Sequence, residues 1–216
     1  MIVLPGPAML AAAALSALLH LRAEYQGPRW QVYLFKPLTT TLLLLLAAFS
    51  PSAHGPRYQL FVVVGLACSL AGDVFLMLPR DRFLPGLASF LLAHLAYVAA
   101  FSSGVPFDTA PLLFLPLVAV AIPLLRLLWP SLGRLRLPVL LYAATILVMV
   151  WRAWARPLAL PSVGAAIAAV GATLFMVSDA ILALNRFHRH FRSAQTLIMA
   201  TYVAAQALIA ISAGVE

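Results

Sequence analysis

The chain alternates between long apolar runs and short breaks that contain Pro, Gly or Arg. Each run has about the length of a helix that spans the hydrocarbon core of a bilayer, which takes roughly 20 mostly apolar residues. The pattern predicts an all-α, polytopic transmembrane bundle of about eight helices, and residues 1–216 as a single integral membrane domain. The predicted spans are residues 4–21, 31–49, 58–78, 83–102, 110–128, 136–150, 162–184 and 194–213.

Composition agrees with this pattern and excludes other classes of protein. Hydrophobic residues make up 64% of the 216 and charged residues 9%, with a mean hydropathy of +1.02, which leaves too little polar surface for a soluble domain. The net charge of +8 comes from arginines at the ends of apolar runs. We therefore expect no nucleic-acid partner. A single cysteine, Cys68, permits neither an intrachain disulfide nor a cysteine metal cluster.

The arginines predict how the chain is oriented in the membrane. With eight spans, only three arginines fall on one side, at Arg57, Arg152 and Arg156. The positive-inside rule places the more basic side in the cytoplasm and both termini outside. Residues 1–21 lack a basic stretch before the apolar run, so we expect a retained helix there. We expect a multi-pass protein of the bacterial inner membrane, or of the endoplasmic reticulum in a eukaryote.

Two parts of the chain resemble each other. Residues 72–80 (GDVFLMLPR) and 178–186 (SDAILALNR) share an aspartate, two leucines and a closing arginine. The helices that follow also correspond, with AYVAA at 96–100 and TYVAA at 201–205. Two copies of four helices would have the same orientation in the membrane. The sequence therefore predicts two parallel repeats, with the halves at residues 1–105 and 106–216.

Only two of the six acidic residues lie inside predicted spans, at Asp73 and Asp179. Lys36, the only lysine, precedes Pro37 in the second span, and the proline removes one backbone donor from the helical ladder. In the predicted orientation these three charges lie at a similar depth near the cytoplasmic ends. Ionisable groups at such depth are costly and usually functional. The structural alternative is a salt bridge that only fixes helix packing.

A histidine adds to this set. His94 lies near the middle of the fourth span with Tyr97 on the same helical face, and the pair lacks the further ligands that a zinc site requires. We expect no metal and no cofactor. Each of these groups has an alternative role as a hydrogen-bonding link between helices.

The motifs FKPLTT (35–40), GDVFL (72–76), AHLAY (93–97), SDA (178–180) and YVAAQ (202–206) together resemble the YhhN-like lysoplasmalogenase family. The resemblance extends over nearly the whole chain. It implies an eight-helix membrane hydrolase that cleaves the vinyl ether bond of a lysoplasmalogen, giving a fatty aldehyde and glycerophosphoethanolamine or glycerophosphocholine. It assigns the catalytic carboxyls to Asp73 and Asp179. The family's lysine corresponds to Lys36. Our own hypothesis is that substrate binding or tuning of the carboxyls falls to Lys36, His94, Tyr97, Tyr202, Thr39 and Asn185.

The chemistry fits two carboxyl groups. Vinyl ether hydrolysis begins with proton transfer to carbon and gives an oxocarbenium ion, so the site needs an acid and a nearby negative charge. The sequence does not assign the two roles, and Lys36 could tune the pair or bind phosphate. A lysophospholipid would extend its chain between helices, with its headgroup near Arg80, Arg82, Arg186 and Arg189.

Two alternatives use the same residues. Repeated halves with intramembrane charges are also typical of a proton-coupled transporter. A lipid-binding or structural membrane protein is the other alternative.

Overall fold

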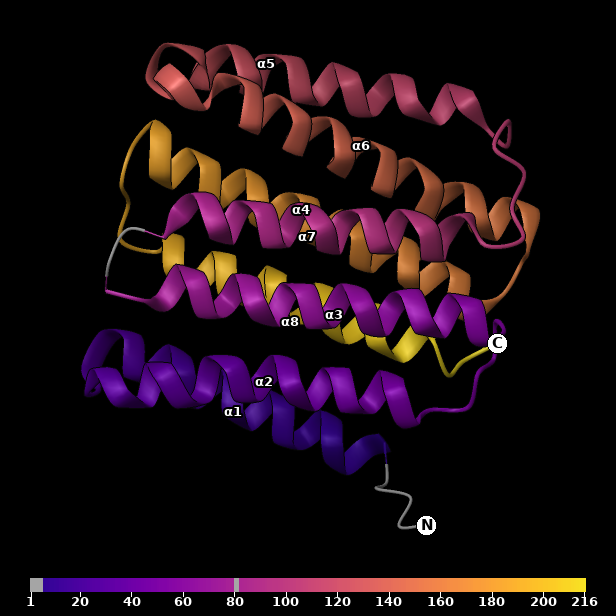
Figure 1. Ribbon diagram of the computed structural model, residues 1–216, viewed down its shortest axis with the longest axis horizontal. Coiled ribbons are helices and arrows are strands. Elements are labelled where there is room, and N and C mark those ends of the chain that lie inside the picture. Colours follow the sequence, from indigo (N-terminus) through magenta and orange to yellow (C-terminus); the bar gives the residue numbers. More distant parts are fainter. Residues whose placement is uncertain (1–5, 80–81) are drawn as a thin grey trace.

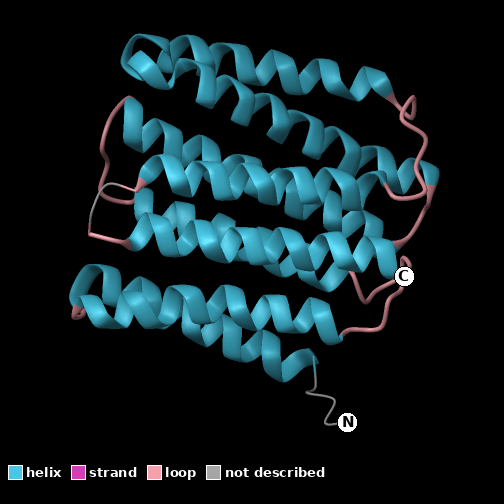
Figure 2. Cartoon of the chain, viewed as in Figure 1, coloured by secondary structure: helices cyan, strands magenta, loops and turns pink. Residues whose placement is uncertain are grey.

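A computed structural model describes residues 6–79 and 82–216, and this part of the chain is helical, without strands (Figures 1 and 2). It contains eight α-helices and two short 3₁₀ turns, η1 (Pro111–Leu113) and η2 (Gly133–Leu135). The helices are α1 (Gly6–Gln26), α2 (Arg29–Phe49), α3 (Pro56–Met77), α4 (Phe83–Ser102), α5 (Phe114–Leu132), α6 (Arg136–Ala159), α7 (Val163–Phe187) and α8 (Ala194–Ser212).

The helices are long and apolar enough to cross a membrane. Within the described residues, seven helical segments meet this requirement, and one of them, Pro111–Ala159, is 49 residues long. That segment contains α5 and α6, which run antiparallel in Figure 1. The chain is therefore a multi-pass integral membrane protein, and the predicted all-α bundle is confirmed.

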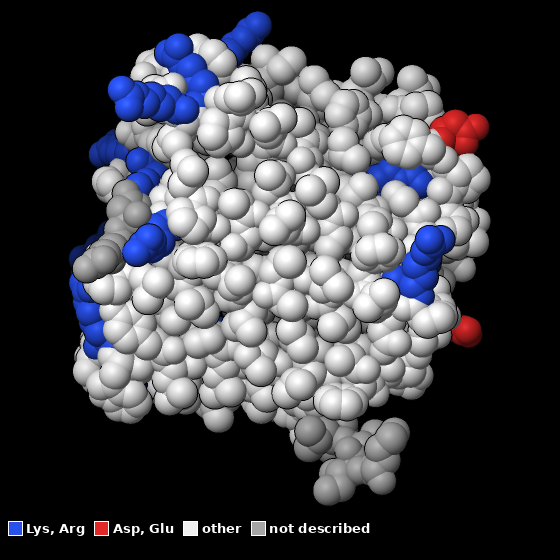
Figure 3. Space-filling model, in the orientation of Figure 1, with Lys and Arg blue, Asp and Glu red and all other residues white. Residues whose placement is uncertain are grey.

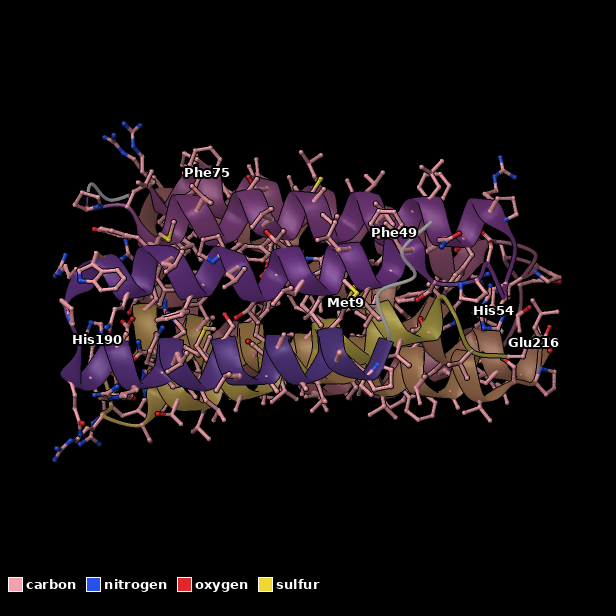
Figure 4. The ribbon with its side chains drawn as sticks, turned by 90° about the horizontal axis from the view of Figure 1, so that it is seen from below. Met9, Phe49, His54, Phe75, His190 and Glu216 are labelled. Atoms are coloured by element: carbon pink, nitrogen blue, oxygen red, sulfur yellow. The ribbon has the colours of Figure 1, made fainter. Side chains whose placement is uncertain are left out.

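Successive helices are antiparallel, so the connections fall at two ends of the bundle (Figure 1). The α1–α2, α3–α4, α5–α6 and α7–α8 connections share one end, and Lys and Arg side chains gather over it (Figure 3). We call this the basic end. The C-terminus lies at the opposite end of the bundle, and Figure 4 shows Glu216 and His54 there, far from His190 at the basic end. The assignment of the basic end to the cytoplasm stays a prediction.

Close contact between α3 and α4 depends on small residues. A Cβ atom added to Gly72 would lie 2.6 Å from Cε2 of Phe90, nearer than two carbons can approach without displacement. The glycine thus lets the Phe90 ring pack directly on the backbone of α3, beside Asp73. Such small residues are the usual means of close helix packing in membranes, where lipid provides no hydrophobic drive between helices.

The sixth helix is longer than predicted. We expected it to end at residue 150 and the arginines beyond it to be loop charges, but α6 continues to Ala159 and buries both Arg152 and Arg156. The Arg152 guanidinium donates to the backbone carbonyls of Val105, Pro106 and Phe107 at 2.9–3.2 Å. Those carbonyls replace the water that the guanidinium loses on burial. The predicted end of the sixth helix was wrong because these tertiary contacts satisfy the charge.

Candidate functional site

A polar cavity of about 750 Å³ opens into the bundle from the basic end. Residues from α1, α2, α3, α4, α7 and α8 line it, so it lies where the two predicted halves meet. Its wall includes the three predicted intramembrane charges, Lys36, Asp73 and Asp179. All three therefore face one space, and their shared depth in the membrane stays a prediction.

Asp73 is the more enclosed of the two aspartates. Its side chain is 2% exposed, and Lys36 Nζ lies 3.6 Å from Oδ1. The hydroxyl groups of Thr40 and Tyr202 both donate to Oδ2, at 2.6 and 2.7 Å. A carboxylate with a cation on one oxygen and two donors on the other has its negative charge well compensated.

Lys36 occupies the cavity wall because of its place in α2. Pro37 lies inside this helix and offers no N–H to the carbonyl of Tyr33, one turn earlier. Tyr33 lines the same cavity. Lys36 and Thr40 are four residues apart and therefore share a helical face, which directs both toward Asp73.

Asp179 has different surroundings. Its side chain is 11% exposed, and its Oδ2 accepts a hydrogen bond from the Tyr142 hydroxyl at 2.9 Å. His94 Nε2 lies 3.5 Å from the same oxygen but is not aligned for a hydrogen bond. Among the described residues, no lysine or arginine forms an ion pair with Asp179. The two aspartates thus differ in charge compensation, Asp73 having a lysine partner and Asp179 none.

Aromatic rings connect the two aspartates. Tyr202, which binds Asp73, packs edge-to-face on Phe175 at a centroid distance of 5.5 Å. Phe175 contacts the ring of His94 at 4.6 Å, and His94 contacts the ring of Tyr142 at 5.1 Å. Tyr142 then binds Asp179. This continuous row of ring contacts fixes both hydroxyl donors through packing rather than through flexible loops.

Each aspartate is contacted by one helix of its own predicted half and by one helix of the other half. Asp73 is contacted by the second helix of its own half, through Thr40, and by the fourth helix of the other half, through Tyr202. Asp179 likewise is contacted by α6 of its own half and by α4 of the other. This arrangement agrees with the predicted duplication, which itself stays a prediction.

Three of the residues proposed from the sequence lie apart from the aspartates. Thr39 donates to Ser16 Oγ and to the Phe35 carbonyl, on the side of α2 that faces α1. Tyr97 donates to Gln206 Oε1 at 2.7 Å and does not line the cavity. Asn185 does line it, and its Oδ1 accepts a hydrogen bond from the Phe191 backbone.

Some of the arginines expected near the substrate headgroup line the cavity. Arg82 and Arg186 line it near the basic end, together with Arg29 and His190. Arg189 is exposed on the neighbouring loop, and Arg80 lies outside the described residues.

Sequence reasoning missed three residues of the site. Thr40 was overlooked in favour of its neighbour, although its spacing of four from Lys36 is a usable signal. Tyr142 is absent from the set of site residues predicted from the sequence. His20 gave no signal, yet it is fully buried, lines the cavity, and has no hydrogen-bond partner on either ring nitrogen within the described structure. Unsatisfied buried nitrogens are costly and point to a ligand or water in the cavity.

The described residues contain no group of three or more His, Cys, Asp or Glu side chains placed to hold a metal ion.

Comparison with known proteins identifies the family. The sequence profile of the YhhN family matches residues 31–213, which include Lys36, Asp73 and Asp179. The chain belongs to the YhhN family. It is 38% identical over 201 residues to the uncharacterized membrane protein YhhN of Escherichia coli O6:H1, covering 92% of this chain and 94% of that protein.

Two relatives in animals have names that state an activity. The chain is 36% identical over 192 residues to human lysoplasmalogenase TMEM86B, covering 86% of this chain and 78% of the relative. It is also 36% identical over 203 residues to bovine lysoplasmalogenase TMEM86A, covering 87% and 80%. No solved structure matches the chain significantly.

Proposed function

We propose that this protein is a lysoplasmalogenase, which hydrolyses the vinyl ether bond of a lysoplasmalogen within the membrane. The observation that carries this proposal is the pair of differently compensated carboxyl groups on one polar cavity. Similarity to relatives named as lysoplasmalogenases over most of the chain supports the choice of substrate. The products would be a fatty aldehyde and a glycerophosphoethanolamine or glycerophosphocholine.

Asp179 is the proposed proton donor. A carboxyl group without a cation beside it stays neutral in a low-dielectric interior, so it has a proton to give. Transfer of that proton to the β-carbon of the vinyl ether leaves a positive charge shared by the α-carbon and the ether oxygen. Water then attacks the α-carbon and returns one proton to the Asp179 carboxylate. The resulting hemiacetal breaks its bond to the glycerol oxygen and releases aldehyde and alcohol.

Asp73 is the proposed stabilising anion. Its carboxylate lines the same cavity and is held by Lys36, Thr40 and Tyr202, so it can oppose the positive charge that develops on the substrate. Glycosidases use a second carboxylate in the same way against an oxocarbenium ion.

The polar end of the substrate would lie toward the basic end. Arg29, Arg82 and Arg186 line the mouth of the cavity and match the charge of a phosphodiester. His20 lines the same cavity, and within the described residues neither of its ring nitrogens has a hydrogen-bond partner. A neutral imidazole has one donor and one acceptor, which suits a glycerol hydroxyl or a phosphate oxygen.

The test is hydrolysis by purified protein in detergent micelles. We expect Asp73→Asn and Asp179→Asn each to lower kcat by about 100-fold or more, the usual loss on removing an acid–base group. Asp108→Asn, an exposed acid at the opposite end, is the matched control and should keep the wild-type rate. Full activity in either cavity variant would refute the assigned roles.

Isotope incorporation tests the reaction type. In D₂O, protonation at carbon followed by immediate reduction of the aldehyde gives an alcohol with one deuterium from solvent at carbon 2. Unlabelled carbon 2 would rule out the proposed protonation. Substrate uptake into sealed vesicles without any aldehyde would instead favour a transporter.

A further inference from the structure

A second cavity lies beside the polar one and is almost entirely apolar. It is a groove of about 190 Å³ between α4, α5, α6 and α7. Leucine, isoleucine, valine, alanine and phenylalanine side chains form most of its lining. Among the described residues, Asp179 is the one charged side chain in its lining, so its chemistry suits a hydrocarbon.

The two cavities meet at the proposed acid. Asp179 lines both of them, as do Leu76, Phe83, Phe90 and Leu182. Of these five residues only Asp179 can donate a proton. A ligand that is polar at one end and apolar at the other could therefore extend from the basic rim, past Asp179, into the groove.

Small side chains contribute to the lining of the groove. Ala121 of α5, Ala143 of α6, and Ala180 and Ala183 of α7 line it. A larger residue at these positions would fill the space that the alanines leave.

The fifth helix forms the outer side of the groove. Among its residues only Leu128 and Leu132 are buried, and Pro123 and Pro130 lie inside it. The helix packs on α6 and α7 and lies at the edge of the bundle (Figure 1). A lipid chain can reach the groove from the bilayer beside this helix, without passing through water.

We propose that this groove binds the hydrocarbon chain of the lysophospholipid, with the first carbons of the chain against Asp179. This inference rests on the proposed function and deepens it, since it places the bond to be cleaved at the junction of the two cavities. The phosphate end then occupies the polar cavity, and the far end of the chain extends toward the bilayer. Chain binding thus positions the vinyl ether β-carbon for proton transfer.

The test compares two neighbouring alanines of α6. Ala143→Phe fills the groove, whereas Ala144→Phe adds the same ring to an exposed position outside it. The probe is a 1-O-alkyl lysophospholipid, which has the same shape as the substrate but no vinyl ether to cleave. We expect Ala143→Phe to weaken its binding about tenfold, as for the lost burial of one or two methylene groups. Ala144→Phe should change binding less than about twofold.

Two further measurements separate the possible outcomes. Soluble glycerophosphoethanolamine has no chain, so its binding should be the same in wild type and Ala143→Phe; a loss would mean that the variant damages the polar cavity. Wild-type protein labelled by a lysolipid with a mid-chain diazirine should be cross-linked in α5, α6 or α7. This second measurement needs no variant and therefore does not depend on how Ala143→Phe folds.

Equal affinities of the two phenylalanine variants, or cross-links confined to α1 and α2, would overturn the groove assignment. If the alkyl lysolipid binds in the groove while wild-type protein releases no aldehyde from lysoplasmalogen, the proposed function fails and the binding site stands. If aldehyde is released but binding is insensitive to Ala143→Phe, the proposed function stands and the groove assignment fails.

Discussion

The ion pair between Lys36 and Asp73 provides a test of the site that needs no substrate. The two side chains are 11% and 2% exposed, so neither charge is well solvated if the other is removed. Loss of one partner from a buried pair costs about 3–5 kcal/mol, whereas replacing both is often near neutral. We therefore expect Lys36→Met and Asp73→Asn each to lower the free energy of unfolding by about 3 kcal/mol, and the double variant to recover most of that loss.

Thermal unfolding of the purified protein, followed by tryptophan fluorescence in one detergent, measures this coupling. A loss of about 3 kcal/mol corresponds to roughly 6–12 °C in Tm for a domain of this size. The asparagine can still accept hydrogen bonds from Thr40 and Tyr202, so the exchange mainly removes charge. If the double variant loses as much as the two single variants together, Lys36 and Asp73 do not stabilise each other and the reasoning is refuted.

Three further predictions test single contacts. Tyr142→Phe removes the donor to Asp179 and should change the rate of aldehyde release more than Tm; an unchanged rate would show that this contact is not needed for the chemistry. His20→Leu should weaken binding of a non-cleavable lysolipid without lowering the Tm of ligand-free protein, because it removes two unsatisfied nitrogens; tighter or equal binding would contradict a ligand role. Arg152→Met should lower Tm by several degrees, since the carbonyls of Val105 and Pro106 lose their donor; an unchanged Tm would show that water replaces it.

Much of the fold follows from the sequence because lipid restricts what a chain can do. Backbone groups must be satisfied within each apolar segment, so runs of this length form helices regardless of their detailed composition. The ends of α2, α4 and α8 fall within two residues of the predicted limits. The C-terminal end of α6 does not agree with the prediction, because burial of Arg152 and Arg156 depends on carbonyls of a distant loop. Periodicity along one helix contains no information on such a contact.

The candidate site, like the fold, could be predicted only in part from the sequence. The rarity of charge inside apolar spans is a property of the sequence, and it was enough to single out Lys36, Asp73 and Asp179.

The sequence by itself determined that these three residues are exceptional, since an uncompensated charge in lipid is too costly to be incidental. Only the tertiary structure decided that Lys36 lies beside Asp73 and not Asp179, that Thr40 rather than Thr39 donates to Asp73, and that Asp179 borders an apolar groove. Those differences depend on the rotation of each helix about its axis. That rotation is set by packing among several helices at once, and no single segment of the chain contains it.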